Sequence, residues 1–322
     1  MAILTSKFKD ALTRIEPSDA DIKNAPLAHN EVRDALADAT GLDDWDVKPI
    51  LIGSYARSVA IRRVKDVDVF CRMYDIGDDV QPVTVLNRFY KALEDAFGSA
   101  RVTRNARSFK VTFPEYDDLH VDAVPARQNW DGTWEIPTKD GEWQPTNPLN
   151  VNELTTAMNK NHNGMYVPTV KLARQARRAI NDARPGGFFV EMCLYDAFLN
   201  RKVDTASHAL AFVTALEAIA DYLDAKVGWG KKLPDPSRPG YDMFFRATDK
   251  QWETARDKFR AAATKARDAY KNDDEHEAAK AYRDLLGVNG DGDDVFPEVP
   301  KAAARLITPG AHNVPAGDRR FG

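Results

Sequence analysis

The stretch LIGSYARSVAIRRVKDVDVFCRM, residues 51–73, decides the fold of this chain and predicts its chemistry. A Gly-Ser pair, Gly53 and Ser54, follows a short apolar run, and Asp66 and Asp68 flank a valine where a second apolar run begins. The second run predicts a strand. Because side chains of a strand alternate between its two faces, both aspartates should project from the same face.

Gly53 and Ser54 are typical of a phosphate-binding turn. Glycine allows the backbone to approach a ligand closely because it carries no Cβ. Ser54 lies at an expected strand-to-helix junction, where its hydroxyl and amide donors and the positive end of the helix dipole would face a phosphate. We therefore expect both residues to contact substrate.

The Asp66/Asp68 pair has two interpretations, a metal site or a solvated pair. The same Asp-x-Asp spacing also occurs, in polar or turn-like surroundings, at Asp19/Asp21, Asp44/Asp46 and Asp291/Asp293. Asp66 and Asp68 lie instead in an apolar strand, where an unpaired charge is costly. Adjacent carboxylates repel each other unless a cation joins them, and hard oxygen ligands suit Mg²⁺ bound together with substrate phosphates. We favour the metal site.

A third carboxylate comes from LHVDAVP, residues 119–125, another short apolar strand that carries Asp122. Alone, this residue would equally fit a turn cap or an arginine partner. Together with Asp66 and Asp68, it allows three acids to converge at one edge of a sheet. Such a trio would hold two Mg²⁺ ions, or Mn²⁺ as an alternative, about 3.5–4 Å apart for phosphoryl or nucleotidyl transfer.

The segment GSYARSVAIRRVKDVDVF resembles the Gly-Ser…Asp-x-Asp element of the polymerase-β-like nucleotidyltransferase superfamily. Within it, the chain most resembles the bacterial CD-NTases, enzymes similar to cyclic GMP–AMP synthase that make nucleotide second messengers in anti-phage defence. The resemblance implies that Asp66, Asp68 and Asp122 are the catalytic Mg²⁺ ligands. It also implies that Gly53 and Ser54 contact the triphosphate.

The resemblance continues in VPTVKLARQARRAINDARPGGFFVEMCLYDAF, residues 167–198. Lys171 matches a helix lysine that grips the nucleotide triphosphate, and Phe188 matches an aromatic residue that stacks on a base. The chain departs from the family pattern in two places. Lys65 stands where a serine is common in the family, and Gly187-Phe188 stands where the family has Ser-Tyr. For Phe188, packing in the core is the alternative.

Lys171 also belongs to a basic cluster with Arg174, Arg177 and Arg178. Spacings of three and four residues place Lys171, Arg174 and Arg178 on one helical face. This face is either solvated, as charged faces commonly are, or a triphosphate contact made mainly by Lys171.

The composition is that of an ordinary globular protein: 322 residues, 43% of them hydrophobic and 29% charged, with a net charge of −4. A protein that wraps long nucleic acid usually has a basic excess, so we expect nucleoside triphosphates, ATP among them, as substrates and no long nucleic acid.

No apolar run approaches the ~18 residues of a membrane span, so no membrane partner is expected. Cys71 and Cys193 lie in separate apolar runs, which favours buried free thiols and a cytoplasmic location.

The pattern along the chain predicts an α+β fold with a polymerase-β-like nucleotidyltransferase lobe and a C-terminal helical lobe. We expect a catalytic core with N-terminal helices over 1–148, a helical lobe closing the nucleotide cleft over 149–286, and a flexible tail over 287–322.

Pro26 would suit the first turn of a helix over about 26–40. The tail ends in Gly322 and resembles those CD-NTase tails that ubiquitin E1–E2-like enzymes conjugate; a terminus without a role is the alternative.

These features together predict a Mg²⁺-dependent nucleotidyltransferase that condenses nucleoside triphosphates into a cyclic oligonucleotide and releases pyrophosphate. Two alternatives remain. The enzyme could transfer a nucleotide to an RNA, small-molecule or protein acceptor, or the chain could be an inactive nucleotide-binding module. The complete acidic trio favours an enzyme over the binding module.

Overall fold

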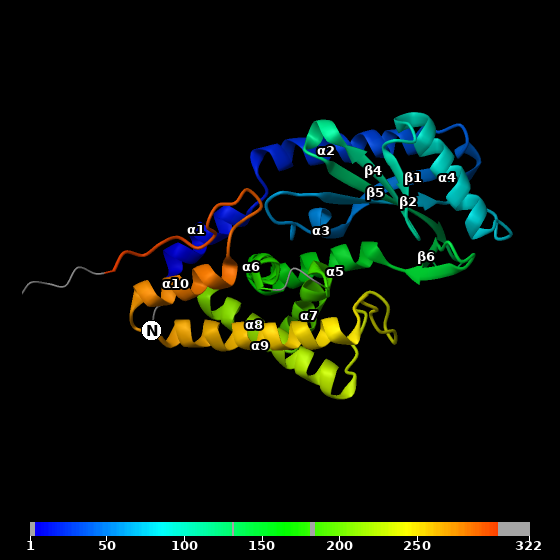
Figure 1. The fold of residues 1–322 in the computed structure, drawn as a ribbon. Helices are drawn as coiled ribbons and strands as arrows, with labels where there is room; N and C mark the ends of the chain where they lie inside the picture. The colour runs from blue at the N-terminus through cyan, green and yellow to red at the C-terminus, as the bar shows by residue number, and fades with distance from the viewer. Residues whose placement is uncertain (1–3, 131, 181–183, 302–322) are drawn as a thin grey trace, which may run out of the picture.

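The computed structural model describes residues 4–130, 132–180 and 184–301, which form a sheet-containing lobe and a helical lobe (Figure 1). The strands are β1 (Val47–Ile52), β2 (Asp66–Met73), β3 (Val102–Arg104), β4 (Phe109–Phe113), β5 (Leu119–Gln128), β6 (Trp134–Pro137) and β7 (Trp143–Thr146). The helices are α1 (Thr5–Ile15), α2 (Asp19–Ala37), α3 (Gly53–Ala56), α4 (Pro82–Phe97), α5 (Pro148–Asn161), α6 (Tyr166–Ile180), α7 (Gly187–Leu199), α8 (His208–Trp229), α9 (Asp249–Lys271) and α10 (Glu275–Leu286). Two 3₁₀ turns cover Asp43–Trp45 and Pro114–Tyr116.

The sheet is mixed, with the order β1-β2-β5-β4-β3 and with β6 and β7 continuing from β5. β2 and β5 run parallel, and the other paired strands run antiparallel. One face is covered by α2 and α4, and alternation along β4 directs Phe109, Val111 and Phe113 into this core (Figure 1). The predicted α+β fold with a small mixed sheet is confirmed.

The start of α2 differs from the sequence prediction. We expected Pro26 in the first turn, but the helix begins at Asp19 and contains Pro26 in its interior. The reason is a capping box: the Ser18 hydroxyl accepts a hydrogen bond from the Asp21 N–H, and the Asp21 carboxylate accepts one from the Ser18 N–H. These contacts satisfy donors that the end of a helix leaves unpaired.

Asp21 is buried rather than solvated. Its carboxylate also accepts the backbone N–H groups of Arg63, at 3.0 Å, and Val64, at 2.9 Å. Asp21 therefore fixes the loop that leads directly into β2, the strand that carries Asp66 and Asp68.

We expect Asp21→Ala to lower the free energy of unfolding by about 1–3 kcal/mol, because it leaves buried backbone donors without a partner. Asp19→Ala is the matched control, since Asp19 lies on the exposed side of the same helical turn. Urea denaturation measures both. Equal stability of the two variants would contradict the role given to Asp21.

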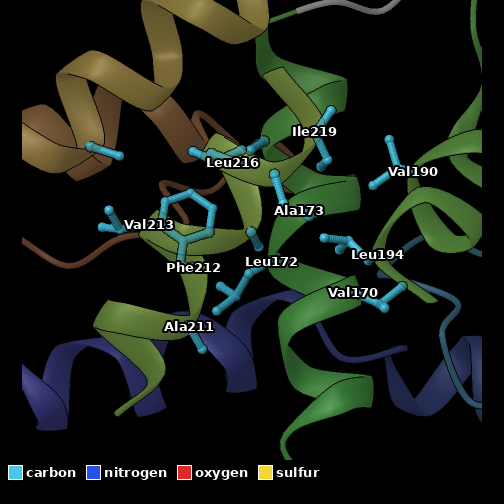
Figure 2. Close-up of a cluster of buried hydrophobic side chains, with 14 of the residues drawn as sticks. Val170, Leu172, Ala173, Val190, Leu194, Ala211, Phe212, Val213, Leu216 and Ile219 are labelled. Atoms are coloured by element: carbon cyan, nitrogen blue, oxygen red, sulfur yellow. The ribbon is translucent and has the colours of Figure 1, made fainter. Parts of the chain in front are cut away.

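The helical lobe contains the larger hydrophobic core, formed by α1 and α5–α10. Figure 2 shows part of it, from α6, α7 and α8: Val170, Leu172, Ala173, Val190, Leu194, Ala211, Phe212, Val213, Leu216 and Ile219.

Cys71 and Cys193 are both buried free thiols, as predicted. Within the described ranges, no helix is long and apolar enough to cross a membrane.

The structure differs from the predicted division in two places, at α1 and after α10. We placed α1 with the catalytic core, but its Phe8 packs edge-on against Tyr282 and Phe296 of the helical lobe, with ring centroids 4.9 and 5.0 Å away. The predicted flexible tail is wrong for residues 287–301, because the buried Val295 and Phe296 belong to the same core. Residues 302–322, including Gly322, lie outside the described residues.

Candidate active site

A cleft of about 580 Å³ is lined by residues of both lobes. From the sheet lobe, Gly53, Ser54 and Asp68 line it, beside Asp66. Phe188 of α7, in the helical lobe, also lines it. The structure thus brings together, at one cleft, sequence-predicted residues that lie more than a hundred positions apart.

The three acids share one face of the sheet. The parallel pairing of β2 with β5 places Asp68 directly opposite Asp122, with Asp66 two residues earlier on β2. Asp122 Oδ1 accepts hydrogen bonds from Asn105 Nδ2 at 3.3 Å and Ser108 Oγ at 3.5 Å, both in the loop between β3 and β4. This register is what brings acids from separate stretches of chain to one place.

The electrostatics of this trio favour a cation. Burial raises the pKa of Asp68 from 3.8 to about 7, and the charges of Asp66 and Asp122 add to the shift. Burial also raises the pKa of Asp122. For Asp68 and Asp122 the ionised form is therefore disfavoured, and a divalent cation bound by hard carboxylate oxygens would offset both burial and repulsion.

The three carboxylates do not form a metal-binding group in this structure. Across the described residues, no group of three or more His, Cys, Asp or Glu side chains meets the spacing of a metal site. The donor set of Asp66, Asp68 and Asp122 nevertheless fits Mg²⁺, because this ion prefers hard carboxylate oxygens.

Gly53 is required for a reason that the sequence did not reveal. Its φ is +79°, a left-handed conformation that favours glycine, and a Cβ there would lie 1.9 Å from Asp68 Oδ2. The missing side chain makes room for a carboxylate of the site.

The helix predicted after Gly53 is only the single turn α3. The Ser54 carbonyl, which belongs to this turn, accepts hydrogen bonds from the N–H groups of Val59 and Ala60, which follow it.

A buried ion network, which sequence reasoning missed, joins the two lobes beneath the cleft. Glu191 of α7 is fully buried and accepts two hydrogen bonds from Arg57, Nε at 2.6 Å and Nη2 at 3.0 Å. Arg174 Nη1 of α6 lies 3.7 Å from the same carboxylate. Burial opposes the charge of Arg57, but Glu191 outweighs it and raises the pKa of Arg57. The signal in the sequence was a lone glutamate in the apolar run GFFVEMCL.

Lys171 is not where the resemblance placed it. It is buried at 6% exposure, pairs with Glu16 at the end of α1, and is absent from the cleft lining. Arg174, one helical turn further along α6, lines the cleft instead. The alternative of a solvated basic face is also wrong, because both side chains are largely buried.

Gly187 explains why Arg174 can occupy this position. A Cβ at Gly187 would lie 3.2 Å from Arg174 Cζ and closer than usual to two of its nitrogens. A serine there, as in the family pattern, would press against the guanidinium. The glycine at position 187, where the family has serine, therefore leaves the space that the Arg174 side chain occupies in the cleft.

Phe188 lies on the wall of the cleft with 40% of its surface exposed, which contradicts the alternative of a core residue. Its ring centroid is 5.5 Å from the Arg57 guanidinium and 6.2 Å from the Phe245 ring. One side of the ring is thus supported by protein, and the exposed part faces the cleft. Such a ring is suited to stacking on a base.

Comparisons with known proteins agree with this fold. Residues 1–159 match the family model of the Second Messenger Oligonucleotide or Dinucleotide Synthetase domain. The chain is 34% identical over 295 residues to a cyclic AMP-AMP-AMP synthase of Acinetobacter, spanning 87% of this chain and 83% of the relative.

Solved structures show the same fold at lower identity. Escherichia coli MS115-1 CdnC with ATP has a TM-score of 0.68 and 19% identity, covering 91% of this chain and 98% of that one. Bradyrhizobium diazoefficiens CdnG with GTP has a TM-score of 0.70 and 15% identity, covering 88% and 96%. The fold and the relatives define a nucleotidyltransferase. More narrowly, this chain belongs to the CD-NTase family of cyclic oligonucleotide synthases.

We expect Asp68→Asn to stabilise the fold at pH 8 while abolishing activity. The folded pKa of about 7 exceeds the unfolded value of 3.8, so the ionised carboxylate costs stability above pH 7. Because Asp68 keeps partial solvation, we expect a gain of about 1–3 kcal/mol, measured by urea denaturation in EDTA. The gain should disappear as the pH falls toward 4. A gain that does not depend on pH would contradict this account.

We expect Arg174→Gln to raise the KM for ATP about tenfold or more, because charge-assisted bonds to phosphate contribute about 1.5–3 kcal/mol. Lys171→Gln should instead lower the free energy of unfolding by about 1 kcal/mol and change the KM less than twofold. Steady-state kinetics and urea denaturation of both variants provide the test. The reverse pattern would return the triphosphate contact to Lys171.

Proposed function

We propose that the protein condenses nucleoside triphosphates, ATP among them, into a cyclic oligonucleotide in a Mg²⁺-dependent reaction that releases pyrophosphate. The observation that carries this proposal is the register of Asp68 opposite Asp122, with Asp66 on the same face, beside a cleft that also holds Arg57 and Arg174. Carboxylates that can hold divalent cations, together with arginines that can bind phosphate, suit a nucleotide triphosphate. The name of the Acinetobacter relative favours ATP and a product of three AMP units.

In this proposal Asp66, Asp68 and Asp122 hold two Mg²⁺ ions, with Mn²⁺ as an alternative. When bound there, such ions neutralise phosphate charge and promote ionisation of a hydroxyl. Asn105 and Ser108 orient the Asp122 carboxylate.

Asp122 accepts the proton of the attacking ribose hydroxyl. The hydroxyl oxygen then forms a bond to the α-phosphorus, and the bond between the α-phosphorus and the bridging oxygen breaks, releasing pyrophosphate. Arg57 and Arg174 stabilise the negative charge that develops on the departing phosphates. Gly53 and Ser54 form the adjoining wall of the cleft, and the Phe188 ring stacks on a base.

Each further condensation repeats this step on the linear product, and a final attack by its own free hydroxyl closes the ring. The proposal includes a signalling role of the product in anti-phage defence, which the family resemblance supports. Conjugation at Gly322 stays a prediction, because that residue lies outside the described part of the chain.

Mass spectrometry of products made from the four nucleoside triphosphates with Mg²⁺ provides the test. We expect a phosphatase-resistant cyclic product without any added acceptor, and none from the Asp66→Asn/Asp68→Asn double variant, whose fold circular dichroism should show to be intact. Product that forms only when an RNA, small molecule or protein is added would favour acceptor transfer. Pyrophosphate release by the double variant would refute the assigned site.

A further inference from the structure

A second pair of arginines lines the cleft, and one of them belongs to the loop that contacts Asp122. Arg107 belongs to the loop between β3 and β4, and Arg246 to the segment between α8 and α9. Both line the cleft, one from each lobe. The pair is separate in sequence and structure from Arg57 and Arg174, which Glu191 holds.

The two guanidiniums belong to the lining of one cleft, and their charges interact there. Burial lowers the pKa of Arg107, and the positive charge of Arg246 lowers it further. Within residues 4–130, 132–180 and 184–301, neither arginine forms a salt bridge; Arg107 Nη1 donates to Gln144 Oε1 at 2.5 Å. Like charges held this way repel each other, so an anion between them would relieve the repulsion.

Two other acids of the cleft lining, Asp235 and Asp242, already have cation partners. Asp235 accepts a hydrogen bond from Arg238 Nε at 2.8 Å, and Asp242 lies 3.2 Å from Lys232 Nζ. They are therefore engaged elsewhere, and Arg107 and Arg246 remain available to a ligand. An anion with several oxygens suits two guanidinium forks, because arginine binds phosphate through parallel N–H···O bonds.

The loop of Arg107 indicates which phosphate this is. Asn105 and Ser108, on either side of Arg107 in sequence, both donate to Asp122 Oδ1. In the proposed reaction Asp122 accepts the proton of the attacking hydroxyl, so the nucleotide that carries this hydroxyl lies beside this loop. The triphosphate that is cleaved lies instead with Arg57 and Arg174.

We propose that Arg107 and Arg246 bind a phosphate group of the acceptor nucleotide, the one whose hydroxyl attacks. This inference rests on the proposed function. The phosphate has two sources with the same chemistry: the 5′-phosphates of a mononucleotide acceptor, or the internal phosphodiester of the linear intermediate. Gln144 positions Arg107 by accepting its hydrogen bond.

A competition between acceptors tests the pair. ATP serves as donor, with AMP and adenosine present at equal concentrations, and mass spectrometry measures the ratio of AMP-derived to adenosine-derived linear product. We expect wild type to favour AMP about tenfold or more, consistent with charge-assisted bonds to phosphate. Arg107→Gln and Arg246→Gln should each reduce this preference at least fivefold while retaining the adenosine-derived product.

The control variant is Arg256→Gln, because Arg256 lies on α9 outside the cleft and pairs with Asp257. It should leave the ratio unchanged. A second competition, between adenosine and the dinucleotide ApA, which has only an internal phosphodiester, distinguishes the sources. A reduced preference for AMP assigns the 5′-phosphates, and a reduced preference for ApA assigns the linkage.

If both arginine variants keep the wild-type ratios in both competitions, the inference is wrong although the proposed function stands. Equal loss of all products, with unchanged ratios, also contradicts it, since a phosphate contact must discriminate between these acceptors. If wild type makes no product from any acceptor, the proposed function itself fails, and this inference with it.

Discussion

The site depends first on the parallel pairing of β2 with β5. This pairing places Asp68 opposite Asp122 and brings together charges that burial and repulsion would keep apart. A shift of one residue would turn Asp122 to the other face of the sheet, because side chains alternate along a strand. Val67, Val69 and Val121 oppose such a shift, since all three are fully buried in the core beneath.

The second constraint is the ion network around Glu191. Arg57 follows α3 in the sheet lobe, whereas Glu191 belongs to α7 in the helical lobe, so their two hydrogen bonds hold the lobes together at the base of the cleft. A buried carboxylate without a partner costs several kcal/mol, which strongly favours this closed pairing. The same network leaves Arg57 and Arg174 at the cleft, so one interaction serves both architecture and substrate binding.

Some features follow from local patterns and others do not. The strands that carry Asp66, Asp68 and Asp122 are predictable, because period-two alternation and apolar runs are local signals. The start of α2 was missed although its capping box, Ser18 with Asp21, is a local signal. The burial of Asp21 was not predictable, because its carboxylate binds the backbone of Arg63 and Val64, far along the chain. The prediction that Lys171 contacts the triphosphate depended on helical periodicity, which defines the face of the helix but not its partner. That partner is Glu16, at the end of another helix.

By itself, the sequence determined the types of elements, the acidic motif, the glycine turn and the family, since each depends on residues close together in the chain. Only the tertiary structure decided that Arg174 replaces Lys171 at the cleft, that Gly53 makes room for Asp68, and that Arg107 and Arg246 line the same cleft. The physical reason is that burial, charge pairing and the space beside a Cβ are set by neighbours in space. A linear pattern does not contain those neighbours.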